Sequence, residues 1–350
     1  MLDQLGLLAV KVEDSDASAV QLVKSEKRTL EIIHGLETEI EKALKPATPY
    51  RGIDIVACGS LARHEWTLGS DFDYLILVND QSMQSAVRDV QRKMYSIVAK
   101  GIDGDDQQLK PPGATGTFGQ AITSFELASK IGLETDTNAV TTRRILMLEE
   151  SISLRNKTQH DELIENILDR YLSEYRSGNR IPRLLLNDVV KYWRIIAVDY
   201  SSKNWTRPTD DGWGLRYLKL RITRKLAFAG MLAAMFEIAL GDGELNALNL
   251  YENLRVPALA RLGRLADYLD DTGKDALRCC VRLAGSFNMM LDDIDFRDMA
   301  SSLEWDGMQN PPEDFRRAER LSHDLQVALE ALFFDGSKDL GMLTRKYGIF

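Results

Sequence analysis

The chain has 350 residues, of which 44% are hydrophobic and 28% charged, and this ordinary globular balance excludes a disordered or fibrous protein. Acidic residues outnumber basic ones by 53 to 44, so the net charge of −9 disfavours general affinity for nucleic-acid backbones, and we expect no binding to duplex nucleic acid. Three cysteines without a C-x-x-C spacing and four scattered histidines exclude a disulfide framework and a local zinc site. The sequence has neither a basic signal-peptide start nor an apolar run long enough to span a bilayer, so we expect a cytoplasmic protein without membrane partners.

The first third of the chain mixes helical and strand patterns. Apolar residues recur at helical spacing, stop before Pro46, and are followed by short apolar runs that are typical of buried strands. A stretch rich in Gly, Asp and Pro over 101–117 is typical of a loop. The predicted helices are 19–45 and 82–99, and the predicted strands are 53–58, 73–78 and a short one near 106–110.

From about residue 120 onward nearly every pattern is helical. The predicted helices are 141–153, 160–176, 183–203, 215–239, 257–270, 273–291 and 312–334. The sequence therefore predicts an α+β protein in which a small mixed-sheet domain is followed by a larger all-helical domain. We place an N-terminal helical segment over 1–50, which packs on a strand-containing domain over 51–155, and the helical domain over 156–350.

The residues that suggest chemistry lie between the first two predicted strands. Asp71 and Asp73 stand two residues apart at the start of a strand, so both carboxylates point to the same side. Carboxylates held that close repel each other unless a cation lies between them, and oxygen ligands suit Mg²⁺ or Mn²⁺. Gly59 and Ser60 follow the preceding strand, where a glycine lets a phosphate approach the backbone and a hydroxyl can donate to it. The alternatives are a solvated strand start for the two aspartates and a helix N-cap for Ser60.

This stretch resembles a known family. Gly59-Ser-Leu-Ala-Arg-His-Glu-Trp-Thr-Leu-Gly-Ser-Asp71-Phe-Asp73, followed by an apolar strand, resembles the nucleotidyltransferase fold of the polymerase β superfamily, and in particular its glutamine synthetase adenylyltransferase and uridylyltransferase-like branch. The resemblance implies that the small domain is a nucleotidyltransferase domain in which Asp71 and Asp73 are catalytic and bind the metal. Arg63 and Glu65 occupy family-like positions; Arg63 is a candidate phosphate ligand, and the alternative is an exposed surface pair.

A second segment, Asp106-Gln-Gln-Leu-Lys-Pro-Pro-Gly-Ala-Thr-Gly116, resembles the D-x-R-L-R-P-x-G-x-x-G segment of the adenylyltransferases. In that family the opening aspartate is the third metal carboxylate, which implies that Asp106 is the third catalytic and metal-binding residue. Lys110 stands where the family has arginine and is a candidate phosphate ligand. The rivals for the third carboxylate are Glu126, Glu134 and Asp136.

A basic island lies in the helical part of the chain. Residues 183–225 carry ten Lys and Arg against four Asp, a net charge of +6, which leaves −15 for the rest of the chain. A basic island in an acidic protein suggests one local anionic ligand, and the candidate triphosphate contacts are Lys191, Arg194 and Lys219. The alternative is a basic face that pairs with acidic surface elsewhere.

Taken together, these patterns predict a metal-dependent nucleotidyltransferase. It would transfer a nucleoside monophosphate from an NTP, with ATP favoured, to a hydroxyl on a protein or on another nucleotide, and would release pyrophosphate. The resemblance favours a protein acceptor, and Mg²⁺ or Mn²⁺ is the expected cofactor. A synthase of oligonucleotide second messengers, a toxin–antitoxin nucleotidyltransferase and a nucleotide-binding regulator without catalysis stay open, as does the oligomeric state.

Overall fold

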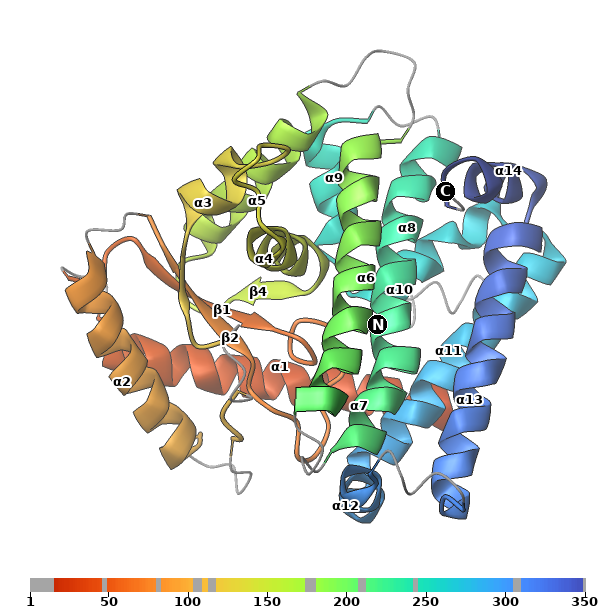
Figure 1. Cartoon of the computed structure of the whole chain (residues 1–350), viewed down its shortest axis with the longest axis horizontal. Coiled ribbons are helices and arrows are strands. Elements are labelled where there is room, and N and C mark those ends of the chain that lie inside the picture. Colours follow the sequence, from red (N-terminus) through yellow and green to blue (C-terminus); the bar gives the residue numbers. More distant parts are fainter. Residues whose placement is uncertain are drawn as a thin grey trace. The chain divides into compact units, whose positions relative to one another are not determined.

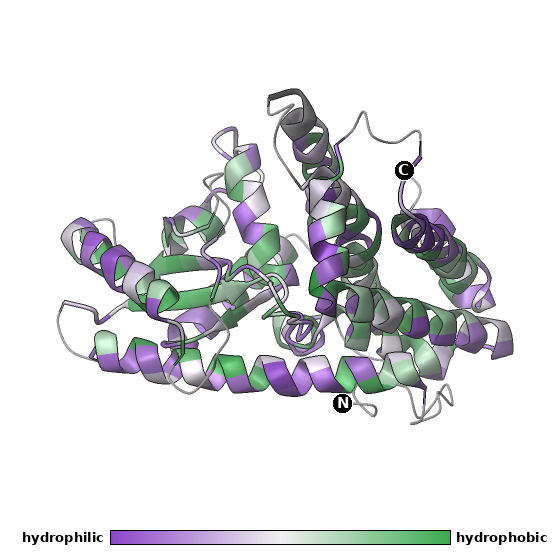
Figure 2. Ribbon diagram, turned by 90° about the horizontal axis from the view of Figure 1, so that it is seen from below, coloured by the Kyte–Doolittle hydropathy of each residue, from purple (hydrophilic) through white to green (hydrophobic). Residues whose placement is uncertain are grey.

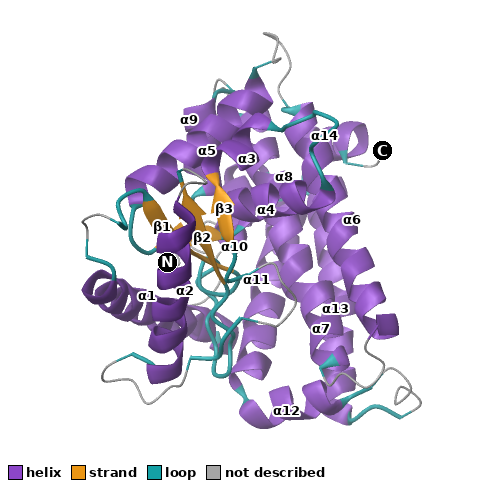
Figure 3. Ribbon diagram, turned by 60° about the vertical axis from the view of Figure 1, so that its left-hand side comes forward, coloured by secondary structure: helices purple, strands orange, loops and turns teal. Residues whose placement is uncertain are grey.

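Helices dominate the structure, a computed structural model. It describes residues 16–45, 49–79, 83–102, 109–112, 118–173, 181–206, 212–241, 245–304 and 310–348. Four short strands form one mixed sheet among the helices (Figure 3), which confirms the predicted α+β layout. Within these ranges no helix combines the length and the apolar character needed to cross a bilayer.

The chain folds into two compact units. We call them the sheet unit, which takes its residues from Ser25–Gly178 and Asn246–Tyr251, and the helical unit, which takes its residues from Met1–Lys24, Asn179–Leu245 and Glu252–Phe350. Helix α1 (Ala17–Ala43) begins in the helical unit and continues in the sheet unit. The predicted boundaries at 50/51 and 155/156 therefore differ from the observed units, because tertiary contacts assign most of α1 and all of 156–173 to the sheet unit.

The sheet has the strand order β3-β2-β1-β4. β1 (Ile53–Cys58) is antiparallel to β2 (Tyr74–Val78) and to β4 (Ser151–Ser153), and β2 is parallel to β3 (Ala121–Thr123). The first two strands confirm the predictions for 53–58 and 73–78. β3 and β4 were not predicted, and the prediction of helix over 151–153 is wrong, since a strand of three residues is too short to show a period of two.

Helices cover both faces of this sheet (Figure 1). Alternate strand residues, among them Ile55 and Ile76, form one core with apolar side chains of α1 and α2 (Gln84–Lys100). The opposite face packs against α4 (Asn138–Glu149) and α5 (Lys157–Leu172), and α3 (Ser124–Ser129) packs on both helices. Because both faces are buried, β2 is apolar along its whole length and β1 is apolar except for Asp54, and the strands of the sheet are mostly green in Figure 2.

The helical unit contains the helices predicted for the second half of the chain. Its elements are α6 (Arg183–Thr206), α7 (Trp213–Lys219), η2 (Leu220–Arg224), α8 (Lys225–Leu240), α10 (Ala258–Gly263), η3 (Arg264–Tyr268), α11 (Asp271–Asp292), α12 (Ile294–Ser302), α13 (Glu313–Glu330), η5 (Ala331–Asp335) and α14 (Lys338–Tyr347), and α9 (Ala247–Leu254) contributes residues to both units. The predicted helix over 215–239 is α7, η2 and α8 in succession, with η2 as a π-helical turn. The first residues of α1 pack on α11, where Gln21 Nε2 donates to Asn288 Oδ1 at 2.9 Å.

Candidate active site

The predicted residues Gly59 and Asp73 lie side by side at one end of the sheet. β1 ends at Cys58, whose backbone N–H still donates to the Asp73 carbonyl at 2.9 Å, so the two segments remain paired beyond the last strand residues. Gly59 then turns the chain with a φ of +68°, a conformation that residues with a Cβ rarely adopt. A Cβ placed there would lie 3.5 Å from Asp73 Oδ2. The Asp73 carboxylate therefore lies close to the glycine turn, at a distance where even a methyl group on Gly59 would touch it.

Asp71 and Asp73 share a face because the residues between and after them are held in the core. The rings of Phe72 and Tyr74 stack at a centroid distance of 5.2 Å, and both are buried in the core with α1 and α2. In an extended segment neighbouring side chains point to opposite sides, so the two carboxylates point away from that core. Asp71 is exposed and Asp73 is half-buried.

Lys110 lies next to Asp71. The two residues form a parallel bridge, and the Phe72 N–H donates to the Lys110 carbonyl at 2.9 Å. Paired residues of neighbouring strands project to the same face, so the exposed Lys110 side chain belongs to the face that carries the carboxylates. Asp106, the predicted third carboxylate, lies outside the described residues.

The rival acids do not join this cluster. Asp136 is held by the buried Arg144, whose Nη2 and Nη1 lie 2.6 and 3.1 Å from the two carboxylate oxygens. Glu126 Oε1 lies 3.4 Å from Lys130 Nζ, and Glu134 is exposed. Among the residues that the structure describes, no group of three His, Cys, Asp or Glu is arranged to bind a metal.

The loop after Gly59 is a compact series of turns, and Ser60 does not cap a helix there. The Arg63 N–H donates to the Gly59 carbonyl at 3.0 Å, and the Glu65 N–H donates to the Ser60 carbonyl at 2.9 Å. His64 has a φ of +58°, which is uncommon for a residue other than glycine. Ser60 is half-buried next to the glycine turn, and its predicted contact with a phosphate stays a prediction.

Arg63 is buried, so the interpretation as an exposed surface pair is wrong. Its Nε donates to Glu65 Oε2 at 2.8 Å and its Nη1 binds Glu150, whose side chain is fully buried. Burial alone would lower the pKa of Arg63, but the charges of Glu150 and Glu65 raise it, so the guanidinium stays ionised. Because the Nε and Nη1 groups of Arg63 are engaged by these carboxylates, the structure favours a role other than direct phosphate contact, and the predicted contact stays untested.

The structure also joins Ser151, His160 and Asp161, which no sequence pattern indicated. Ser151 pairs with Cys58 across β4 and β1; its Oγ lies 2.8 Å from His160 Nε2, and His160 Nδ1 lies 3.7 Å from Asp161 Oδ1. Burial lowers the pKa of His160 to about 4, so the ring is neutral. The Ser151 hydroxyl donates to the Met147 carbonyl at 2.6 Å, which leaves no proton for His160 to remove. We assign this cluster a structural role.

The basic candidates lie in the other unit. Lys191 and Arg194 are on α6, and Lys219 ends α7. Close by in the sequence, the Arg221 guanidinium lies 5.2 Å from the centre of the Tyr217 ring, and the pKa of Lys225 is lowered by burial and by the charge of Arg221. The predicted contact of Lys191, Arg194 and Lys219 with a triphosphate stays a prediction.

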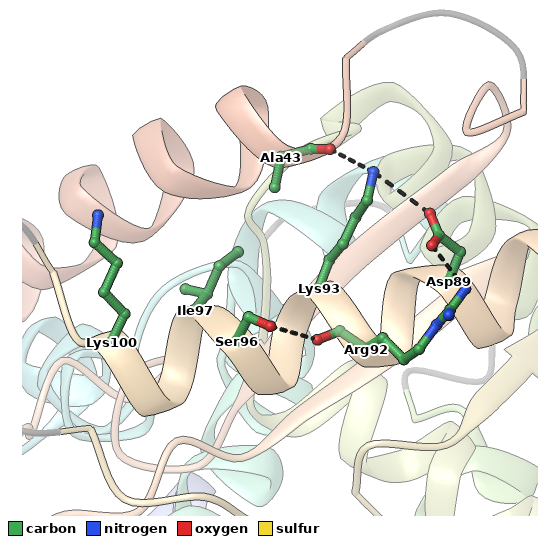
Figure 4. Close-up of a pocket in the computed structure, with 7 residues that line it drawn as sticks. All are labelled: Ala43, Asp89, Arg92, Lys93, Ser96, Ile97 and Lys100. Carbon is green, nitrogen blue, oxygen red and sulfur yellow. Dashed lines mark hydrogen bonds and ion pairs between the residues drawn. The ribbon is translucent and has the colours of Figure 1, made fainter.

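Two surface pockets of the sheet unit lie apart from the carboxylates. One, of about 330 Å³, lies along α2 (Figure 4), where Lys93 Nζ donates to the Ala43 carbonyl at 2.8 Å and lies 3.4 Å from Asp89. The other, of about 300 Å³, is lined by Gly52, just before β1, and Asn79, just after β2. Both lie at the end of these strands that is away from Gly59 and Asp73. Neither pocket includes a predicted site residue.

Comparison with known proteins finds no family model and no curated protein that matches the chain.

Proposed function

We propose that the sheet unit is a nucleotidyltransferase domain of the polymerase β type. In this proposal the protein transfers a nucleoside monophosphate from an NTP, with ATP favoured, to a hydroxyl on a protein. The observation that supports it most is the common face of Asp71 and Asp73 beside the Gly59 turn, with Lys110 paired to Asp71. The adenine base and the protein acceptor rest on the sequence resemblance alone.

The donor set fits a hard divalent cation. Asp71 and Asp73 offer carboxylate oxygens at the start of β2, and an exposed carboxylate can share a cation with the phosphates of a nucleotide. Mg²⁺ or Mn²⁺ held there would neutralise the triphosphate and make an acceptor hydroxyl more acidic. In the proposal Asp106 supplies the third carboxylate.

The remaining residues act on the phosphates. Backbone at the Gly59 turn and the Ser60 hydroxyl would contact the β- and γ-phosphates, and Lys110 would offset their charge from the neighbouring segment. The acceptor oxygen forms a bond to the α-phosphorus while the bond from that phosphorus to the β-phosphate oxygen breaks. The hydroxyl proton passes to solvent and pyrophosphate leaves.

Nucleotide binding without transfer is the second candidate. It requires only Asp71 and Asp73, since one cation can bridge two carboxylates to a triphosphate. A regulator of this kind would bind NTP with the same metal dependence and release it unchanged.

Binding is tested first, by calorimetry on the full chain with each NTP and Mg²⁺ or Mn²⁺. We expect binding that disappears when EDTA removes the cation and in Asp71→Asn. Asp169→Asn, which changes an exposed aspartate on α5 of the same unit, is the matched control and should bind like the wild type. Equal affinity with and without the cation would show that the carboxylates do not form the site.

Transfer is tested with NTPs labelled at the α-phosphate, followed by separation of protein-bound label from small products. We expect Asp106→Ala to bind NTP within about tenfold of the wild type and to lose transfer by orders of magnitude, because the activating metal acts mainly on the transition state. The neighbouring Asp105→Ala is the control. A wild-type protein that binds NTP and labels no acceptor would favour the regulator.

A further inference from the structure

The buried charges around Arg63 lie where the loop of the candidate site meets the sheet. Arg63 belongs to the loop that leaves β1 at Gly59 and returns to β2 at Asp71, and its side chain is only 8% exposed. Glu150 follows α4 and directly precedes Ser151, which pairs with Cys58 at the end of β1. The Arg63–Glu150 ion pair therefore ties the loop back to the strand end from which it departs.

The same side chain also fixes the turn that presents Ser60. Arg63 Nε binds Glu65 at 2.8 Å, while the backbone N–H groups of these two residues hold the carbonyls of Gly59 and Ser60. His64, between them, adopts a left-handed conformation that is unfavourable for a residue with a Cβ, and the surrounding contacts must offset this strain. Gly59, Ser60 and the three residues 63–65 therefore form one unit with the end of β1.

Stability alone does not account for a buried ion pair here. Removing an arginine and a glutamate from water costs nearly as much as their attraction returns, and apolar side chains of similar volume serve stability as well. A guanidinium held by two carboxylates, however, fixes direction as well as distance. What the pair adds is a defined position for the loop.

We propose that Arg63 is a positioning residue that acts through Glu150 and Glu65 to hold the Gly59–Ser60 turn against the Asp71–Asp73 face. This inference rests on the proposed function, since the position it fixes is that of a triphosphate-binding turn. Arg63 itself touches no phosphate. Loosening the pair lets the turn move away from the carboxylates, and a displacement near 1 Å is enough to weaken binding substantially.

The direction in which Glu150→Gln changes the affinity for Mg·ATP distinguishes this positioning role from direct phosphate contact. If Arg63 bound the phosphates, Glu150→Gln would remove a competing negative charge and strengthen the binding of Mg·ATP. If Arg63 acts through Glu150, the same substitution loosens the loop and weakens binding. Glutamine keeps the size of glutamate and can still accept one hydrogen bond, so the variant should fold.

The experiment measures Mg·ATP affinity by calorimetry on the full chain, with thermal unfolding recorded for every variant. We expect Arg63→Lys to bind about tenfold more weakly and Glu150→Gln about fivefold more weakly, because lysine lacks the rigid planar donors that hold two carboxylates in a fixed direction and glutamine lacks the charge. In transfer assays the KM for ATP should rise more than kcat falls. Arg144→Lys, which disrupts a second buried arginine–carboxylate pair of the sheet unit, is the matched control and should bind within twofold at a comparable loss of stability.

Unchanged or tighter binding by Glu150→Gln overturns the inference, and so does equal weakening by Arg144→Lys, which would indicate a general loss of stability. If Arg63→Lys fails to fold, Glu150→Gln and its control decide the question. If the wild-type protein binds no nucleotide, both the proposed function and this inference are overturned. If the wild type binds Mg·ATP and Glu150→Gln binds it with the same affinity, only the inference is overturned.

Discussion

Buried ion pairs with carboxylates are a feature of the sheet unit, whereas the helical unit, which also buries Asp188, Arg261 and Arg297, is marked by close contacts at its glycines. Arg63 with Glu150 and Arg144 with Asp136 are ion pairs inside the sheet unit, and Asp54 is fully buried on β1. In the helical unit twelve of the sixteen residues of α8 are buried, and a Cβ on Gly230 would lie 2.7 Å from the Ala258 carbonyl oxygen. The sheet unit should therefore respond to changes of charge and pH, and the helical unit to changes of side-chain size.

The largest effect on stability is expected from Gly285→Ala in the helical unit. Gly285 lies on α11 against the first turn of α1, and an added Cβ would overlap the backbone carbonyl of Ser18. Because backbone cannot move aside as a flexible side chain can, we expect a loss of about 2–4 kcal/mol in the free energy of unfolding, measured with urea. Gly132→Ala in the sheet unit is the control: no atom lies within 4 Å, so only its φ of +73° should cost about 1 kcal/mol. Equal losses would contradict the contrast between the units.

Asp54→Asn should change how stability depends on pH. Burial raises the pKa of Asp54 to about 6 although its Oδ1 accepts the backbone N–H groups of Arg155 and Asn156. The folded protein therefore binds a proton that the unfolded chain releases near pH 4, so Asp54 makes stability fall as pH rises from about 4 to about 6. Asparagine keeps the hydrogen-bond acceptor without the charge. We expect the difference in free energy of unfolding between the variant and the wild type to be roughly 1–3 kcal/mol more favourable to the variant at pH 8 than at pH 4. Urea unfolding of both proteins at the two pH values measures this change. The same difference between variant and wild type at pH 4 and pH 8 would contradict the prediction.

His160→Gln should have the opposite effect in the same unit. The folded-state pKa of His160, about 4, lies below the ordinary value of 6.5, so the unfolded chain binds the extra proton and stability is lost as pH falls from about 6.5 to about 4. In the wild type the pH dependence due to His160 adds to the opposite one due to Asp54. Replacing either residue leaves the pH dependence due to the other. With His160→Gln, stability should fall as pH rises from 4 to 6. If the free energy of unfolding of this variant rose between pH 4 and pH 6, the assignment of the opposite dependence to Asp54 would be wrong.

The smallest effect is expected from Lys42→Ala, also in the sheet unit. Lys42 pairs with Glu39 at 2.6 Å on α1, but its side chain is 59% exposed. Exposed pairs three residues apart contribute at most about 0.5 kcal/mol, so the free energy of unfolding should change by less than that. If Lys42→Ala lost as much free energy of unfolding as a variant that breaks a buried ion pair, surface ion pairs would stabilise the sheet unit as strongly as buried ones.

Sequence patterns predicted the elements that have a local signal. The apolar runs of β1 and β2 and the helical periods of α1, α2 and most of the helical unit are visible because each element shows its own burial pattern. The position of Asp71 and Asp73 followed from the same alternation. β3 and β4, with three residues each, carry no such pattern.

What the sequence could not show are contacts between distant residues. Arg63 and Glu150 are 87 positions apart, and nothing near either residue indicates a partner; the pairing of β4 with β1 brings them together. Ser151 and His160 are close in the sequence, but their contact depends on the turn between β4 and α5. The polar network around the candidate site is thus a product of tertiary structure.

Helix α1 has a consequence for the order in which the chain can fold during synthesis. Its residues from Ser25 onward join the sheet unit, whose main segment is complete by Gly178, whereas its first turns belong to the helical unit. Gln21 and its partner Asn288 are 267 positions apart, so those turns must wait until almost the whole chain has left the ribosome. During translation the main segment of the sheet unit can assemble first, whereas the first turns of α1 gain their packing partners only after α11 has emerged.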